Sequence, residues 1–200
     1  MALSVGVATL SEMDPILARL AERNGVPPLW PRDPGFPTMV RLILEQQVSL
    51  ASADAAYRKL EQSIGRVEPD RFVDLSDAEL RTIGFSRQKA GYVGDLAAGL
   101  VDGSIDLGAV DGLADGPATD RLLAIRGIGP WTAACYLLFA LRRPDVWPPG
   151  DRALQVSMGR VYALADVPDV GMSNERAAKW RPLRSIAARM LWYEYLGAPA

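Results

Sequence analysis

The amino-acid sequence predicts an all-α fold, and three observations support this prediction. Helix-capping patterns recur along the chain, with apolar segments of helical spacing between them. No stretch alternates apolar and polar residues for long enough to predict a β-sheet. Glycine- and proline-rich segments separate the helical ones and predict connectors. With 200 residues, the chain is long enough to bury a core as one domain or as two closely packed lobes.

The first elements are predicted from capping residues and prolines. In residues 11–15 a serine precedes two acids and a proline, which predicts the start of a helix, and the Asn-Gly pair at 24–25 predicts its end. The five prolines of residues 26–37 exclude a regular helix there and predict an extended connector. An apolar helix is then expected over residues 39–44, ending within residues 45–48.

The middle of the chain carries further capping signals. Either Ser49 or Ser52 is expected to cap the next helix. Residues 76–79, Ser-Asp-Ala-Glu, have the spacing of a capping box ahead of another helix. The segment 84–100 is expected to begin with a turn and continue as a helix. The glycine- and aspartate-rich residues 102–120 predict a connector with at most a short helical turn.

Residues 121–138 predict two helices joined by a tight hairpin. Gly127 supplies a residue that tolerates positive φ after the first helix, and Gly129 lets another backbone approach closely. Pro130 fits the first turn of the second helix, where its missing N–H is not needed. Backbone N–H groups from Gly127 to Thr132 then lie at a positive helix start, which attracts a phosphate. An ordinary connector between helices needs glycine for the same backbone reasons.

A carboxylate follows this hairpin in residues 148–151, Pro-Pro-Gly-Asp. Asp151 is a candidate catalytic residue, but the same local sequence is typical of a helix N-cap. The two roles can coexist, because capping fixes the carboxylate in place. Helices are expected after it near residues 152–165 and 173–196.

The chain contains no histidine and a single cysteine, Cys135, which restricts its chemistry. Metal clusters of the Cys/His type, histidine-based triads and an iron–sulfur cluster held by four cysteines are excluded. Any general base must therefore be Asp or Glu, unless a Lys or Tyr is strongly perturbed.

The net charge and the hydropathy of the chain restrict its partners and its location. The formal net charge is −2, which is unlike a protein that binds DNA by bulk electrostatics. Local placement of arginine and of backbone N–H groups can still bind phosphate. No run of about 18 apolar residues predicts a membrane span, and no basic segment precedes an apolar one at the N-terminus. A cytoplasmic location is therefore expected.

Five sequence blocks occur in the order used by helix-hairpin-helix DNA glycosylases. They are residues 43–49, 84–90, 127–133, 145–151 and 180–185. The chain resembles the 3-methyladenine DNA glycosylase II family, the alkylation-repair branch, in a compact form without an extra N-terminal β domain. The resemblance implies one helix-hairpin-helix unit over residues 1–200. Its two closely packed lobes would span roughly residues 36–115 and 116–200, with residues 1–35 packed against them and the active site in the cleft between the lobes.

The resemblance implies a monofunctional DNA glycosylase of base excision repair. Such an enzyme flips an alkylated base of the 3-methyladenine type out of double-stranded DNA and hydrolyses its N-glycosidic bond, leaving an abasic site. Asp151 matches the family's catalytic aspartate, whose carboxylate stabilises the oxocarbenium charge of the sugar. Members that also cut the backbone carry a lysine where this chain has Trp131, and tryptophan cannot form a Schiff base. The enzyme would act as a monomer and without a catalytic cofactor.

Further site residues follow from the same resemblance. Gln47 matches the side chain that fills the gap left by the flipped nucleotide, whereas Gln46 is expected to be structural. The base pocket would use Trp131, Trp192 and Tyr136. The phosphate contacts would come from Arg126, Gly127, Ile128, Gly129 and Thr132, and the backbone carbonyls of Leu123, Ile125 and Ile128 would hold a sodium or potassium ion.

Other interpretations of these residues stay open. Core packing is the alternative for Trp131 and Trp192. Solvated helix faces are the alternative for Arg87, Lys89, Arg152 and Arg184 as phosphate contacts. A noncatalytic DNA-binding or damage-sensing module and a purely structural helical domain are the alternatives for the whole chain. Retention of Asp151 favours the enzyme, because a carboxylate near the strand does not help to bind phosphates.

Overall fold

The computed structural model describes residues 2–197 and divides the chain into two compact helical units. One unit is the continuous segment Arg32–Leu141, and the other combines Met1–Pro31 with Arg142–Ala200. No strand occurs among residues 2–197, so the all-α prediction is confirmed.

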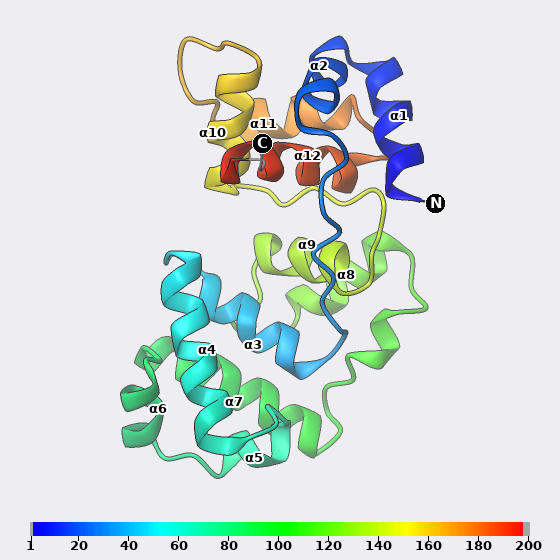
Figure 1. Cartoon of the computed structure of the whole chain (residues 1–200). Coiled ribbons are helices and arrows are strands. Elements are labelled where there is room, and N and C mark those ends of the chain that lie inside the picture. Colours follow the sequence, from blue (N-terminus) through cyan, green and yellow to red (C-terminus); the bar gives the residue numbers. More distant parts are fainter. Residues whose placement is uncertain (1, 198–200) are drawn as a thin grey trace. The chain divides into compact units, whose positions relative to one another are not determined.

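The unit of residues 32–141 is built around α3, an apolar helix that packs against α4, α7 and α9. Phe36 of α3 begins a row of edge-on aromatic contacts that continues through Phe72 to Phe85. The elements of this unit are α3 (Phe36–Glu45), α4 (Leu50–Ile64), α5 (Pro69–Val73), α6 (Asp77–Ile83), α7 (Arg87–Val101), the 3-10 turn η1 (Gly108–Val110), α8 (Asp115–Leu123) and α9 (Pro130–Phe139) (Figure 1).

The second unit is arranged around α12, which packs against α1, α2, α10 and α11. The elements from the N-terminal part of the chain are α1 (Leu3–Met13) and α2 (Pro15–Asn24). The C-terminal part contributes α10 (Arg152–Val161), α11 (Val170–Ala178) and α12 (Arg184–Leu196) (Figure 1). Helices from both ends of the chain thus share one core.

The division into units differs from the predicted lobes. The predicted boundary near residue 115 lies inside the unit of residues 32–141, because α9 packs against both α8 and α3 and so joins the hairpin to the preceding helices. The first 31 residues belong with α12 and not with both lobes. The predicted cleft stays a prediction.

Most local capping predictions are confirmed. Ser49, and not Ser52, caps α4 by accepting the N–H of Ser52. Ser76 and Glu79 form the predicted capping box at the start of α6. The proline-rich connector contains no helix from Gly25 to Gly35, and only its last proline, Pro37, lies in the first turn of α3.

Three helix boundaries were predicted wrongly. Asp14, and not Ser11, caps α2, because Ser11 lies inside α1 and its hydroxyl donates back to the Val7 carbonyl. The expected helix over residues 173–196 is two helices, since Pro182 cannot continue the first one. The expected connector of residues 102–120 ends where α8 begins at Asp115.

The Asp14 carboxylate ties the N-terminal helices into their unit. Its Oδ1 accepts the backbone N–H groups of Ile16 and Leu17, and its Oδ2 accepts Tyr162 Oη–H at 2.6 Å and Trp180 Nε1–H at 2.9 Å. Burial raises the pKa of this carboxyl, but the hydrogen bonds outweigh burial and hold the pKa below its ordinary value. The ionised form is therefore the one that stabilises the fold.

We expect Asp14→Asn to lower the free energy of unfolding at pH 7 by about 2 kcal/mol, because an amide cannot accept all four donors. Since the native pKa is depressed, the stabilisation is present above about pH 4 and is lost as the pH falls through the native value. Urea denaturation at pH 7 and pH 3 measures both effects. The exposed Asp166→Asn is the control, and an equal loss at both pH values would contradict this explanation.

Candidate functional site

The loop before α9 requires glycine at position 127 for two reasons. Gly127 has φ +84°, and a Cβ placed on it would lie 2.2 Å from Cγ of Tyr92, a side chain of α7. The predicted close approach at Gly129 is not made by this chain, since no heavy atom of the described residues, apart from its two chain neighbours, comes within 4 Å of a Cβ built there. The tight contact is therefore at Gly127, and the space beside Gly129 is open.

The start of α9 differs electrostatically from the six α-helix starts in the described residues that have a side-chain cap. No side chain caps it, whereas a side-chain acceptor caps α2, α4, α6, α7, α10 and α11. Pro130 occupies the first turn, as predicted. The first N–H groups of a helix have no acceptor within the helix and carry its partial positive charge. This start therefore has the polarity and the open space that an anion needs.

Gln46 joins the end of α3 to this hairpin. Its Nε2 donates to the Gly127 carbonyl and to Oγ1 of Thr132, both at 3.0 Å. The predicted structural role of Gln46 is thus confirmed. Thr132 is 2% exposed, so its hydroxyl is also structural, and contact with DNA through its backbone stays a prediction.

Gln47 has the location that the predicted wedge needs. It is exposed in the turn between α3 and α4 and has φ +57°, an unusual conformation for a non-glycine residue. Val48 and Leu50, which follow it, are 47% and 59% exposed. The turn and the first residue of α4 therefore present one amide and two apolar side chains to solvent.

Lys89 and Arg184 were considered as phosphate contacts, and both bind protein groups instead. Lys89 Nζ donates to the carbonyls of Leu44 and Gln46 at 2.7 and 2.8 Å, and burial lowers the pKa of its amine. Arg184 pairs with the Asp145 carboxylate in its own unit. These partners engage two of the three Lys89 donors and the Nε and Nη2 groups of Arg184.

Arg126 extends into solvent from the hairpin, but its guanidinium already pairs with an acidic side chain. The guanidinium forms an ion pair with Asp95 of α7 and lies 5.5 Å from the centre of the Tyr92 ring. Exposed ion pairs of this kind contribute little to stability. The pair can therefore open for a phosphate, and a contact between Arg126 and DNA stays a prediction.

Asp151 is both the N-cap of α10 and the partner of a tryptophan. Its Oδ1 accepts the Leu154 N–H at 2.8 Å and Trp192 Nε1–H at 3.1 Å. The predicted cap is confirmed. The indole N–H of Trp192, in α12, fixes the carboxylate. The two residues are 41 positions apart, so the sequence alone does not predict this contact.

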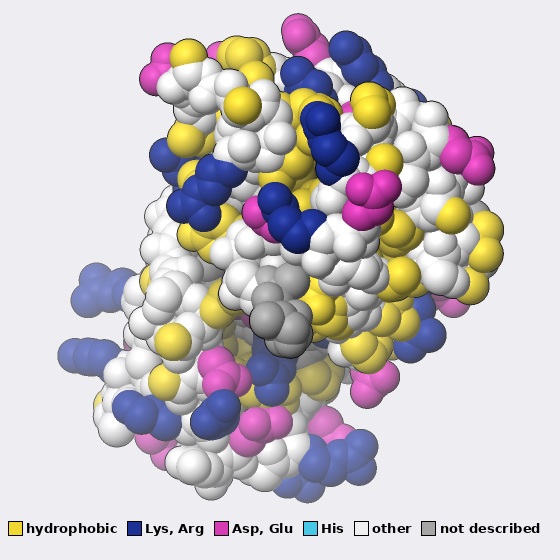
Figure 2. Space-filling view, turned by 45° about the horizontal axis from the view of Figure 1, so that its top comes forward, with side chains coloured by type: hydrophobic (Ala, Val, Ile, Leu, Met, Phe, Trp, Pro, Cys, Tyr) yellow, Lys and Arg dark blue, Asp and Glu magenta, His cyan; other side chains and the backbone are white. Residues whose placement is uncertain are grey.

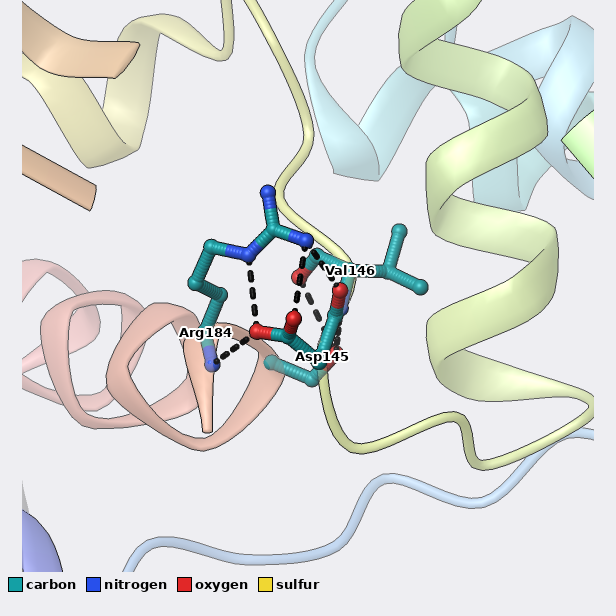
Figure 3. Close-up of polar contacts among 4 residues, drawn as sticks. Asp145, Val146 and Arg184 are labelled. Carbon is teal, nitrogen blue, oxygen red and sulfur yellow. Dashed lines mark hydrogen bonds and ion pairs between the residues drawn. The ribbon is translucent and has the colours of Figure 1, made fainter. Parts of the chain in front are cut away.

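The first turn of α12 holds the loop that leads to Asp151. Arg184 donates from Nε and Nη2 to the Asp145 carboxylate at 2.7 and 3.0 Å, and also from Nη2 to the Asp145 carbonyl (Figure 3). The Ser185 hydroxyl bonds to both the N–H and the carbonyl of Val146 at 2.9 and 3.0 Å. One helix therefore fixes both ends of the 145–151 segment.

The predicted base-pocket aromatics have different surroundings. Trp131 is half-buried at the start of α9. Tyr136 is buried in the same helix, and its hydroxyl accepts the Gly35 N–H at 2.9 Å. Trp192 is 9% exposed and bonded to Asp151. Tyr136 and Trp192 thus have structural contacts, and contact of any of the three with a base stays a prediction.

The wider surface agrees with the small net charge. On the face drawn in Figure 2, Lys and Arg side chains are interspersed with acidic and apolar ones and form no continuous basic stripe. Within residues 2–197, no helix is long and apolar enough to cross a membrane. The same residues contain no group of three or more His, Cys, Asp or Glu side chains that could hold a metal ion.

Comparisons with known proteins agree on one family. Residues 40–182 match the family model described as HhH-GPD superfamily base excision DNA repair protein. The Bacillus subtilis protein YfjP, named as a candidate DNA-3-methyladenine glycosylase, is 30% identical over 162 residues, which cover 77% of this chain and 56% of that protein. This chain therefore spans little more than half the length of that relative.

Two solved structures have the same fold. A DNA-3-methyladenine glycosidase from Bacillus halodurans has a TM-score of 0.80 and 29% identity, covering 95% of this chain and 88% of its own. A 3-methyladenine DNA glycosylase from Schizosaccharomyces pombe, in complex with abasic DNA, has a TM-score of 0.83 and 23% identity, covering 98% of each chain. The second likeness shows the fold alone.

We expect Asp151→Ala to lower the free energy of unfolding by about 1 kcal/mol, because it removes the cap of α10. Asp151→Asn should change it by only a few tenths of a kcal/mol, since an amide oxygen also caps a helix. Urea denaturation followed by circular dichroism measures both. Equal losses for the two variants would mean that charge, and not capping, dominates at this position.

Proposed function

Because this chain belongs to the HhH-GPD superfamily of base excision DNA repair proteins, we propose that it is a DNA glycosylase. It removes alkylated bases of the 3-methyladenine type from damaged duplex DNA and leaves an abasic site. The observation that carries this proposal is the Asp151 carboxylate, fixed at the start of α10 by the Leu154 N–H and the Trp192 indole. The relatives named for alkylated-base removal support the choice of substrate.

The reaction breaks the bond between C1′ of the sugar and the base nitrogen, and the bonding electrons leave with the base. An alkylated base such as 3-methyladenine is cationic, so it departs neutral without a general acid. This agrees with a chain that contains no histidine. The sugar becomes an oxocarbenium ion, which the Asp151 carboxylate stabilises by its charge. A water oxygen then bonds to C1′, and Asp151 accepts the proton that this water loses.

The unit of residues 32–141 supplies the DNA contacts in this proposal. The open, uncapped start of α9 accepts a phosphate through the backbone N–H groups around Gly129. Arg126 adds a charge-assisted contact to the same strand. Gln47 enters the duplex where the flipped nucleotide leaves a gap. The solved structure of the same fold in complex with abasic DNA supports DNA as the ligand.

We further propose that the enzyme is monomeric and needs no catalytic cofactor. The hairpin carbonyls of Leu123, Ile125 and Ile128 are the groups that would hold a sodium or potassium ion. The Ile125 carbonyl accepts the Ile128 N–H at 3.1 Å, and an oxygen of this kind has a second lone pair for a cation. Such an ion, when bound, adds positive charge beside the phosphate and takes no part in bond cleavage.

We expect Asp151→Asn to reduce base release from methylated duplex DNA by at least about a hundredfold, because the carboxylate charge is lost. The measurement is the yield of alkali-labile sites, with circular dichroism to follow the fold. Asp169→Asn is a matched control, since Asp169 caps α11 in the same unit through the Met172 N–H at 2.8 Å.

The activities of these variants distinguish a glycosylase from a noncatalytic damage-sensing module. Loss of activity in Asp151→Asn alone supports the glycosylase. Duplex DNA binding without base release by the wild type would instead favour a noncatalytic damage-sensing module, and equal activity of all three proteins would assign Asp151 to capping only.

The Trp131 side chain supports a monofunctional enzyme, because it cannot form a Schiff base with the abasic sugar. We therefore expect borohydride to trap no covalent complex between this protein and DNA, under conditions that yield abasic product. Gel electrophoresis of the treated mixture, with a known glycosylase/lyase as positive control, makes the measurement. A trapped complex would show that an amine of the protein, such as that of Lys59, Lys89 or Lys179, acts as a nucleophile.

A further inference from the structure

One face of α7 contacts both segments to which the proposed function assigns DNA binding. Lys89, Tyr92 and Asp95 are spaced three residues apart and so lie near one another on the helix surface. Lys89 bonds to the turn before Gln47, whereas Tyr92 packs against Gly127 and Asp95 pairs with Arg126. The turn and the hairpin therefore share one support.

The turn that presents Gln47 is held on its N-terminal side by Lys89. The C-cap of α3 is not a glycine. Lys89 Nζ instead donates hydrogen bonds to the carbonyls of Leu44 and Gln46 at this end of the helix. The amine reaches these two carbonyls across 45 and 43 residues of sequence. A cation at the C-terminal end of a helix also interacts favourably with the helix dipole.

The same turn is tied to the hairpin by the side chain of Gln46. Its amide spans from the end of α3 to the Gly127 carbonyl and the Thr132 hydroxyl. The backbone of Gln46 is thus held by Lys89 while its side chain holds the hairpin. Any shift of the turn would have to break contacts on both sides.

The backbone conformation of Gln47 shows why the turn needs this support. A φ of +57° is unfavourable for a residue with a Cβ and persists only where the surrounding structure imposes it. The contacts of Lys89 and Gln46 immediately precede this residue. They are the groups positioned to impose the conformation, because Gln47 itself is exposed.

We infer that Lys89 and Gln46 are positioning residues, which hold the Gln47 side chain at a fixed place relative to the phosphate-binding hairpin. This inference rests on the proposed function. Binding of a phosphate at α9 then places Gln47 against the base stack without further ordering of the turn. Phosphate capture and insertion into the duplex are coupled through protein contacts inside one unit, and Lys89 acts without touching DNA.

The test uses the full-length protein and a duplex with 2-aminopurine opposite a tetrahydrofuran abasic analogue. Wild-type binding should change the 2-aminopurine fluorescence, and Gln47→Ala should abolish that change. We expect Lys89→Met, which keeps the aliphatic stem but lacks the donors, to lose most of the change while its Kd for the duplex stays within about threefold of wild type. Lys89→Arg, which has N–H donors again, should recover the fluorescence change. Lys59→Met is the matched control, because Lys59 is an exposed lysine of the same unit.

A second measurement compares base release from methylated duplex and single-stranded DNA. Lys89→Met should slow release from the duplex by about tenfold and leave release from the single strand unchanged, because an unpaired base needs no wedge. A wild-type fluorescence response in Lys89→Met would overturn the inference, and so would equal loss on both substrates. If the wild type releases no base, the proposed function fails, but the fluorescence measurement still decides the inference.

Discussion

The second unit depends on the hydrogen bonds that the polar side chains of α12 form with the surrounding segments. This helix lies against the other helices of its unit, so its polar groups need protein partners where it is buried. Arg189 is 3% exposed, and burial together with the nearby Arg142 lowers its pKa to about 10. Arg184 donates to Asp145, Ser185 to Val146, Arg189 to Leu29 and Trp192 to Asp151, whereas Glu194 accepts from Asn24. The candidate catalytic carboxylate is thus one of several groups fixed by a single helix.

The sequence predicts local features of this fold well and distant contacts poorly, and particular residues show why. Ser49 and Ser76 cap the helices that directly follow them, so short patterns suffice to find them. The cap of α2 was assigned to the wrong residue because Ser11 lies inside α1. The contacts of Asp14 with Tyr162 and Trp180 could not be predicted, since these residues lie far along the chain. Asp151 itself could be found from the ordered sequence blocks. Its bond to Trp192 could not, since no spacing rule relates residues that meet only after folding.

The two segments assigned to DNA depend on backbone geometry more than on charge. The net charge is −2, and Asp95 already pairs with the exposed arginine of the hairpin. An open helix start and a fixed turn bind by shape and by oriented N–H groups, which need no excess of basic residues. The positive φ and the close Tyr92 ring leave only glycine at position 127. The acidic composition is therefore compatible with the proposed contact with phosphate.

The division of the chain into a continuous unit and a discontinuous one also sets an order of assembly on the ribosome. Residues 32–141 emerge as an unbroken segment and can pack α3 against its neighbours before the rest is made. Residues 2–31 emerge before this segment, whereas α12, against which α1 and α2 pack, emerges after it. The apolar surface that these two helices later bury against α12 must therefore wait until the whole continuous unit has been made, and the unit that carries Asp151 closes only when α12 leaves the exit tunnel.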